Sequence, residues 1–219
     1  SSRHQKGVVA EGYIKEARQK IAATLKVDPK ELIITSGGTE SNNMALIGTA
    51  LAAKRKGNHI ITTAVEHPSV KATASFLEEQ GFRITFLSVD SRGQISLEDL
   101  KEALTPDTIL VSIMYVNNEI GTIQPVEEAA KLVHATVPGA VFHVDAIQAY
   151  GKVMIRPKQH GIDLLSVSSH KFHGPKGAGF LYCSSKVNLH PIIFGGGQQS
   201  GMRSGTENVP AIAGLATAV

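Results

Sequence analysis

Short apolar runs alternate with helix-like patterns along most of this sequence. Several runs have the length and composition of buried strands: Leu32–Thr35, Asn58–Ala64, Ile109–Tyr115, Val141–Val144 and Asp163–Val167. Between them, apolar residues recur every three or four positions, which is the pattern of an amphipathic helix. Strands that alternate with helices favour a mostly parallel sheet covered on both faces. We therefore expect an α/β fold with three layers, α/β/α, around a mostly parallel, mixed sheet, in one domain over residues 1–219.

Composition excludes several other classes of protein. A hydrophobic fraction of 42% in 219 residues allows a sizeable core, and a net charge of +3 without a basic block indicates no nucleic-acid partner. No apolar run approaches the roughly 18 residues of a membrane span, and no signal peptide opens the chain. The one cysteine, Cys183, rules out a disulfide framework. These features predict a cytoplasmic protein with no nucleic-acid or membrane partner.

The segment Ser166–Gly179 holds an unusually placed lysine, Lys171. This lysine follows the apolar run Asp163–Val167 and lies among hydroxyl and imidazole groups, whereas an ordinary lysine lies on the outer face of a helix. The Gly and Pro residues of the segment predict that it is not helical. A lysine that attacks a carbonyl must be unprotonated, which requires desolvation and chemical neighbours. We therefore interpret Lys171 as a candidate nucleophile.

Polar or glycine-rich residues follow each of these apolar strands. In open parallel sheets, ligands bind beyond the carboxyl ends of the strands. The residues expected at those ends are Ser36, Gly37, Gly38, Thr39, His67, Asn118, Asp145, Gln148, Ser168, His170 and Lys171. The sequence therefore predicts one ligand site at this edge of the sheet.

The glycine pair Gly37-Gly38 allows two interpretations. It could form only a tight turn. A glycine pair and the Thr39 hydroxyl before a helix can also hold a phosphate, through free N–H groups and the helix dipole. The segment is not a Walker loop, because no Gly-Lys-Ser/Thr follows, and it lacks the third glycine of a dinucleotide fingerprint.

The remaining residues are ambiguous singly. His67 could be a turn residue, and Asn118 and Gln148 could cap loops. Asp145 is a stronger candidate for ligand binding, because a carboxylate at the end of a buried strand needs a cationic or N–H partner. No metal is expected, because the histidines of Ser166–Gly179 have no Asp, Glu or Cys at ligand spacing.

Together these parts match one cofactor, pyridoxal 5′-phosphate (PLP). They are a phosphate cradle, a buried carboxylate, a flat aromatic ring, amides for a phenolic oxygen and a nucleophilic lysine. In such a site the lysine forms a Schiff base, and the acid partners the pyridinium nitrogen.

The sequence resembles the cysteine desulfurases of the NifS/IscS type, which are fold-type I PLP enzymes grouped with the class V aminotransferases. The motifs that carry the resemblance run the whole length in order: Ile34–Asn43, Glu66-His67, Val116–Gly121, His143–Gln148, Ser169–Gly177 and Gly195–Asn208. The resemblance implies an enzyme that takes sulfur from L-cysteine to give L-alanine and an enzyme persulfide, for iron–sulfur cluster or thiolation pathways. A sulfur-acceptor protein would be a further partner.

The resemblance also implies roles for individual residues. Lys171 would be the Schiff-base lysine, His67 would stack on the pyridine ring, and Asp145 would pair with its nitrogen. Asn118 and Gln148 would approach the ring hydroxyl. The phosphate would be held at the Gly38 turn by Thr39, Ser168 and His170, with Thr206 reaching in from the second subunit of a homodimer.

Some positions depart from the family pattern. Gln199-Ser200 stands where the family usually has Glu-Arg, near the expected dimer interface, and Ser169 stands where Gly is frequent. We expect Cys183 not to be the persulfide-forming cysteine, because it follows a strand and lies outside any mobile loop. The family's N-terminal segment and its small C-terminal domain, with the cysteine loop and substrate-binding arginine, are expected beyond Ser1 and Val219.

Two alternatives remain open at this stage. One is another class V PLP enzyme, such as an aminotransferase or a selenocysteine lyase. The other is a non-catalytic PLP-binding scaffold.

Overall fold

A seven-stranded sheet forms the centre of the molecule, in the order β1-β7-β6-β5-β4-β2-β3, in a computed structural model that describes residues 4–219. The strands are β1 (Leu32–Thr35), β2 (His59–Thr63), β3 (Arg83–Leu87), β4 (Thr108–Met114), β5 (Val141–Asp145), β6 (Leu164–Ser168) and β7 (Gly179–Cys183). Strand β7 pairs antiparallel with both β1 and β6, whereas the pairs among β2 to β6 are parallel. Every strand except β7 therefore runs in one direction, which confirms the mostly parallel, mixed sheet.

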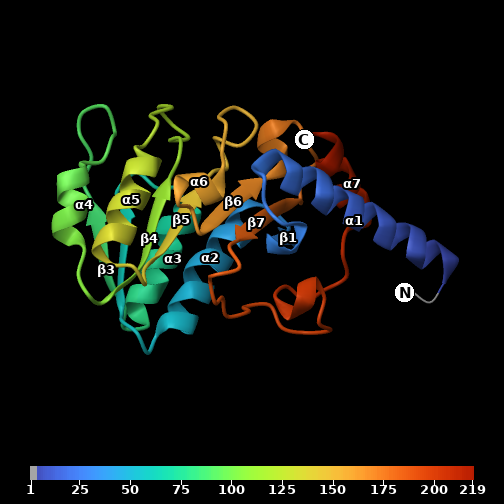
Figure 1. Cartoon of the computed structure of the whole chain (residues 1–219), viewed down its shortest axis with the longest axis horizontal. Helices are drawn as coiled ribbons and strands as arrows, with labels where there is room; N and C mark the ends of the chain where they lie inside the picture. The colour runs from blue at the N-terminus through green and yellow to red at the C-terminus, as the bar shows by residue number, and fades with distance from the viewer. Residues whose placement is uncertain (1–3) are drawn as a thin grey trace.

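Helices cover both faces of the sheet, as the three-layer prediction requires (Figure 1). One core is shared with α2 (Gly38–Ala53) and α3 (Pro68–Glu79). The other core is shared with α1 (Gln5–Leu25), α4 (Leu97–Ala103), α5 (Val126–Thr136) and α7 (Val209–Thr217). A one-turn helix, α6 (Pro157–His160), precedes β6. Within residues 4–219, no helix is both long and apolar enough to cross a bilayer.

Strand β4 shows why the apolar runs become central strands. All its residues are buried, and successive side chains point to opposite faces of the sheet. Leu110 belongs to the core beneath α2 and α3, while Val111 and Ile113 belong to the core on the other face. A continuous apolar run is what a strand needs when helices cover both of its faces.

Two local predictions are wrong. The sequence pattern predicts a loop over residues 36–41 with a helix beginning after it, but helix α2 already begins at Gly38. The glycine pair itself makes the turn out of β1, and Gly37 has φ of 148°. The segment after β6 is not free of helix, since Ser169–Phe172 forms one 3₁₀ turn that includes Lys171. That turn ends at His173, whose φ of 68° is left-handed, so the helix cannot continue.

Candidate active site

One cavity of about 290 Å³ lies at the carboxyl ends of the parallel strands. It is lined by Gly38, Thr39, His67, Met114, Asn118, Asp145, Ile147, Gln148, Ser168, His170 and Lys171. The structure therefore brings together all the predicted cofactor residues except Thr206. These side chains come from the ends of β1, β2, β4, β5 and β6, as the strand directions require.

Asp145 is the most deeply buried charged group of the cavity, with 4% of its surface exposed. Its Oδ1 accepts a hydrogen bond from the Ile147 N–H at 3.0 Å, and its Oδ2 accepts one from Asn42 Nδ2 at 2.8 Å. Burial raises the pKa of Asp145, while these two donors and the nearby His67 act in the opposite direction. The carboxylate is thus oriented by fixed donors at the wall of the cavity.

Two residues near Asp145 were not singled out from the sequence. Asn42, on α2, donates to both Asp145 and Ser69, and Ser69 Oγ lies 2.8 Å from His67 Nδ1. His67 is also the N-cap of α3, where its Nδ1 accepts the Ser69 N–H at 3.1 Å. Asn42 lies four residues after Gly38, a spacing that puts both on the same face of a helix. The sequence could have indicated this only if α2 had been predicted to begin at Gly38.

A second buried carboxyl, Glu66, lies beside this network. Its Oε1 accepts hydrogen bonds from Met114 N–H at 2.8 Å and from the Thr63 hydroxyl at 2.9 Å, whereas its Oε2 has no partner within residues 4–219. Burial, followed by the charge of Asp145, raises the pKa of Glu66 to about 8. Because Asp145 has donors on both oxygens, we assign the negative charge to Asp145 and the proton to Glu66.

The N-terminus of α2 supplies the anion-binding part of the site. A second cavity of about 310 Å³ adjoins the first and shares Gly38, Thr39, Ser168 and His170 with it. The first N–H groups of a helix have no intrahelical acceptor, so those of α2 are available to a phosphate here. Lys176 also lines this second cavity and adds a positive charge.

Lys171 and His170 lie in the 3₁₀ turn after β6, and both are exposed in this chain. His170 Nδ1 lies 3.0 Å from the Ser168 hydroxyl. Partial burial lowers the pKa of His170, and the charges of Lys171 and Lys176 act in the same direction. Residues 4–219 therefore place the amine of Lys171 at the cavity without the desolvation that a nucleophilic lysine needs, so a bound ligand or another protein surface must supply it.

The two predicted amide contacts also line the cavity. Asn118 Nδ2 donates to Glu119 at 2.9 Å, and Gln148 Oε1 lies 3.5 Å from Lys152 Nζ. Among residues 4–219, Asn118 Oδ1 and Gln148 Nε2 have no hydrogen-bond partner, so both side chains can still approach a phenolic oxygen.

The residues of the two cavities fit PLP. A buried, oriented carboxylate suits a pyridinium nitrogen, a helix N-terminus suits a phosphate, and a lysine lines the same cavity. Together the two adjoining cavities reach the size of an ordinary small-molecule site, which begins at roughly 300 Å³.

Thr206 lies in a different place. It lines a cavity of about 180 Å³ with Gln199, Arg203 and Glu207, apart from Lys171. The segment around it packs on its own chain: Arg203 forms an ion pair with Glu40 at 2.7 Å. Within one chain, therefore, Thr206 does not join the cavity that holds Lys171.

Gln199, which departs from the family pattern, forms a hydrogen bond with the outermost strand of the sheet, β1. Its Oε1 accepts a hydrogen bond from the N–H of Ile34 in β1 at 3.0 Å and one from Arg18, and its Nε2 donates to Glu207. This side chain therefore uses both an amide acceptor and an amide donor, which the glutamate expected here could not supply.

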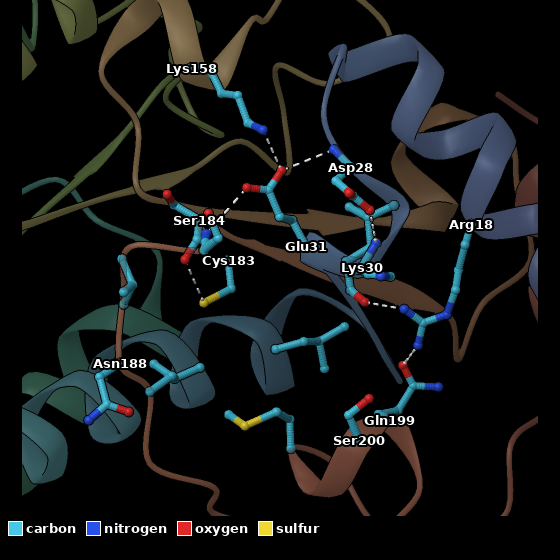
Figure 2. A pocket seen from close by; sticks show the side chains of 16 residues that line it. Arg18, Asp28, Lys30, Glu31, Lys158, Cys183, Ser184, Asn188, Gln199 and Ser200 are labelled. Carbon is cyan, nitrogen blue, oxygen red and sulfur yellow. Dashed lines mark hydrogen bonds and ion pairs between the residues drawn. The ribbon is translucent and has the colours of Figure 1, made fainter.

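Cys183 lies far from Lys171, in the cavity shown in Figure 2. That cavity measures about 450 Å³ and lies at the amino ends of the parallel strands, whereas Lys171 lies beyond their carboxyl ends. In the β6–β7 ladder, Cys183 faces Leu164, while Gly179 faces Ser168, next to the site. Four strand residues span roughly 13 Å.

The surroundings of Cys183 also disfavour a thiolate. Burial raises the pKa of Cys183 to about 12, and the charges of Glu31 and Asp163 act in the same direction. Glu31 itself is held by Lys158 at 2.8 Å and by the N–H group of Asp28 (Figure 2). It also accepts the N–H of Ser185. Cys183 is therefore neither near the site nor an activated nucleophile.

Comparison with known proteins gives one consistent family. The family model for aminotransferase class V matches residues 1–219. The cysteine desulfurase IscS of Dictyoglomus turgidum is 49% identical over 219 residues, which are 100% of this chain and 55% of that protein. The chain thus spans little more than half the length of the curated relatives it matches.

Solved structures agree with this result. A NifS-like protein superposes with a TM-score of 0.96 at 44% identity, over 98% of this chain and 59% of that one. The structure of SspA in complex with cysteine superposes with a TM-score of 0.94 at 41% identity, over 98% of this chain and 62% of that one. From the family match along its whole length and these similarities, we conclude that the chain belongs to the aminotransferase class V family, among relatives named cysteine desulfurases.

Proposed function

We propose that residues 1–219 form the PLP-binding domain of a cysteine desulfurase. The whole enzyme would take sulfur from L-cysteine, giving L-alanine and an enzyme persulfide that passes sulfur to an acceptor protein. The observation that carries this proposal is the meeting of Lys171, His67 and the buried Asp145 in one cavity at the N-terminus of α2. The cysteine desulfurase relatives, and the cysteine in the SspA structure, support the choice of substrate.

Each part of the cofactor would contact a different group of residues in the cavity. Asp145 would hold the ring nitrogen, and His67 would lie against the ring. Asn118 and Gln148 would contact the ring hydroxyl. The phosphate would bind at Gly38, Thr39, Ser168 and His170, and Lys171 would bond the aldehyde carbon. Bound PLP supplies an electron sink for charge that develops on the substrate carbon.

The chain's own residues prepare this chemistry. Asp145 keeps a negative charge where a positive ring nitrogen would lie, because its two oxygens already accept hydrogen bonds. Lys171 is free of hydrogen-bond and ion-pair partners within residues 4–219, so its amine can bond the cofactor and later carry a proton. We assign sulfur acceptance to a cysteine of the whole enzyme other than Cys183, for the reasons of distance and pKa given above.

We further propose a cytoplasmic homodimer in which Thr206 completes the phosphate site of the partner subunit. Support comes from the position of Thr206, which lies outside the Lys171 cavity of its own chain. The exposure of Lys171 also supports a covering surface from elsewhere.

The proposal is tested by titrating the protein with PLP and following its visible absorption and equilibrium binding. We expect the wild type to bind PLP with the absorption of a lysine-linked cofactor, and Lys171→Ala to lose that absorption while retaining weaker binding at the phosphate end. Cys183→Ser is the matched control and should behave as the wild type. Equal absorption in Lys171→Ala and wild type, or no binding by the wild type, would exclude the proposed function.

A further inference from the structure

A buried amide on α2 lies between two lining residues of the cavity, Asp145 and His67, in a hydrogen-bond network. Asn42 has 0% of its surface exposed, and its Nδ2 lies 2.8 Å from Asp145 Oδ2 and 2.9 Å from Ser69 Oγ. Asp145 ends β5, whereas Ser69 lies in the first turn of α3. A single side chain thus contacts Asp145, which lines the cavity, and Ser69, whose hydroxyl lies beside His67, another lining residue.

The chemistry of Asp145 fixes the orientation of this amide. An ionised carboxylate only accepts hydrogen bonds, so the NH₂ group of Asn42 must face it, and its Oδ1 must point away. Asn42 Oδ1 indeed has no partner within the described part of the chain. A buried acceptor left without a partner costs stability. The two hydrogen bonds from Nδ2 must therefore contribute more to stability than the unpaired Oδ1 costs.

The same reasoning fixes the hydrogen on His67. Ser69 Oγ accepts from Asn42, so the hydroxyl hydrogen of Ser69 is free to point at His67 Nδ1, 2.8 Å away. The Ser69 N–H also points at this nitrogen, at 3.1 Å. Because two donors face Nδ1, the neutral ring must carry its hydrogen on Nε2.

We propose that Asn42 and Ser69 are positioning residues that couple the charge of Asp145 to the tautomer and orientation of the His67 ring. This inference rests on the proposed PLP site. The hydrogen-bond network Asp145–Asn42–Ser69–His67 orients Asp145, the proposed partner of the cofactor's ring nitrogen, together with His67, the proposed stacking ring. It does so before any cofactor binds. Neither residue needs to touch the cofactor to act in this way.

The coupling is measured in the protein without cofactor, by ¹⁵N NMR of its histidine rings, with His67→Gln to assign the signals. We expect the Nε2–H tautomer of His67 in the wild type. Ser69→Ala should raise the share of the Nδ1–H tautomer roughly tenfold, because it removes the hydroxyl donor to Nδ1. Asn42→Leu should raise that share by less, because it leaves both donors of Ser69 in place and removes only the hydrogen bond that directs the hydroxyl hydrogen toward His67. The control is Thr49→Val, since Thr49 is also buried and polar on α2 but its hydroxyl has no hydrogen-bond partner among residues 4–219.

Cofactor affinity supplies the second measurement. Asn42→Leu should weaken PLP binding roughly tenfold more than Thr49→Val, and Ser69→Ala should weaken it less, because the Asn42–Asp145 bond remains. Ser69→Ala is a small change, so it still tests the inference if Asn42→Leu does not fold. An Nδ1–H tautomer in the wild type, or variants indistinguishable from Thr49→Val, would overturn the coupling. If the wild type binds no PLP, the proposed function and the role of Asn42 toward the cofactor both fail, whereas the tautomers test the coupling separately.

Discussion

Replacing Asp145 with Ala is expected to weaken PLP binding tenfold or more. The variant removes a charge-assisted hydrogen bond to the ring nitrogen, worth roughly 1.5–3 kcal/mol, and each 1.4 kcal/mol corresponds to about a factor of ten in affinity. Asp145→Asn should lose most of the same affinity, since it keeps the shape and removes the charge. The measurement is equilibrium titration of wild type and variants with PLP.

Asp163→Asn is the matched control for this experiment. Asp163 is half-buried, and burial raises its pKa as it raises that of Asp145; its Oδ2 accepts the N–H of Phe142 at 2.8 Å. Asp163, however, lies at the amino end of β6, whereas Lys171 follows the carboxyl end of that strand. This control should lose stability but not cofactor affinity. If Asp145→Ala keeps the affinity of the wild type, the role of Asp145 is only structural, as the acceptor of the Ile147 N–H and the Asn42 amide.

Replacing Glu66 with Gln is expected to stabilise the protein relative to the wild type by an amount that grows as the pH rises from about 5 to about 8. An unfolded glutamate releases its proton near pH 4.3, whereas burial and the charge of Asp145 raise the pKa of Glu66 to about 8 in the folded state. Between these values the folded protein holds a proton that the unfolded chain has lost. Wild-type stability therefore falls across this window, by at most about 1.4 kcal/mol per pH unit, and levels off above it.

Gln stays neutral and keeps an oxygen for the N–H of Met114, so the variant lacks this loss. Urea unfolding of both proteins at several pH values measures the difference, with Glu102→Gln as a control at an exposed glutamate on α4. The stability difference between Glu66→Gln and wild type should grow with pH up to about 8. A difference independent of pH would show that Glu66 is ionised in the folded protein.

The sheet could be predicted from sequence because strands buried on both faces are apolar throughout. β4 and β6 agree with the predicted runs to within one residue at each end. The residues after them reach one cavity because the carboxyl ends of parallel strands meet at the same end of the sheet. The direction of a strand decides which residues meet. For the same reason, Cys183 could be separated from the site once β7 was known to run antiparallel.

The hydrogen-bond network behind the cavity could not be predicted. The start of α2 at Gly38 depends on backbone angles that a glycine pair permits but does not require, and those angles decide where Asn42 points. Glu66 was part of a recognised motif, but its charge state follows from three-dimensional burial beside Asp145. The 3₁₀ turn that carries Lys171 is similarly too short to leave a periodic pattern.

Reduction with borohydride in the presence of PLP, followed by peptide mapping, tests the central claim most directly. Reduction makes the bond between a lysine and the cofactor permanent, so mass spectrometry identifies the residue. We predict the cofactor mass on the peptide that contains Lys171, and its absence from that peptide in Lys171→Arg. Label on Lys152 or Lys176 in place of Lys171, or no label in a protein that binds PLP, would contradict the account.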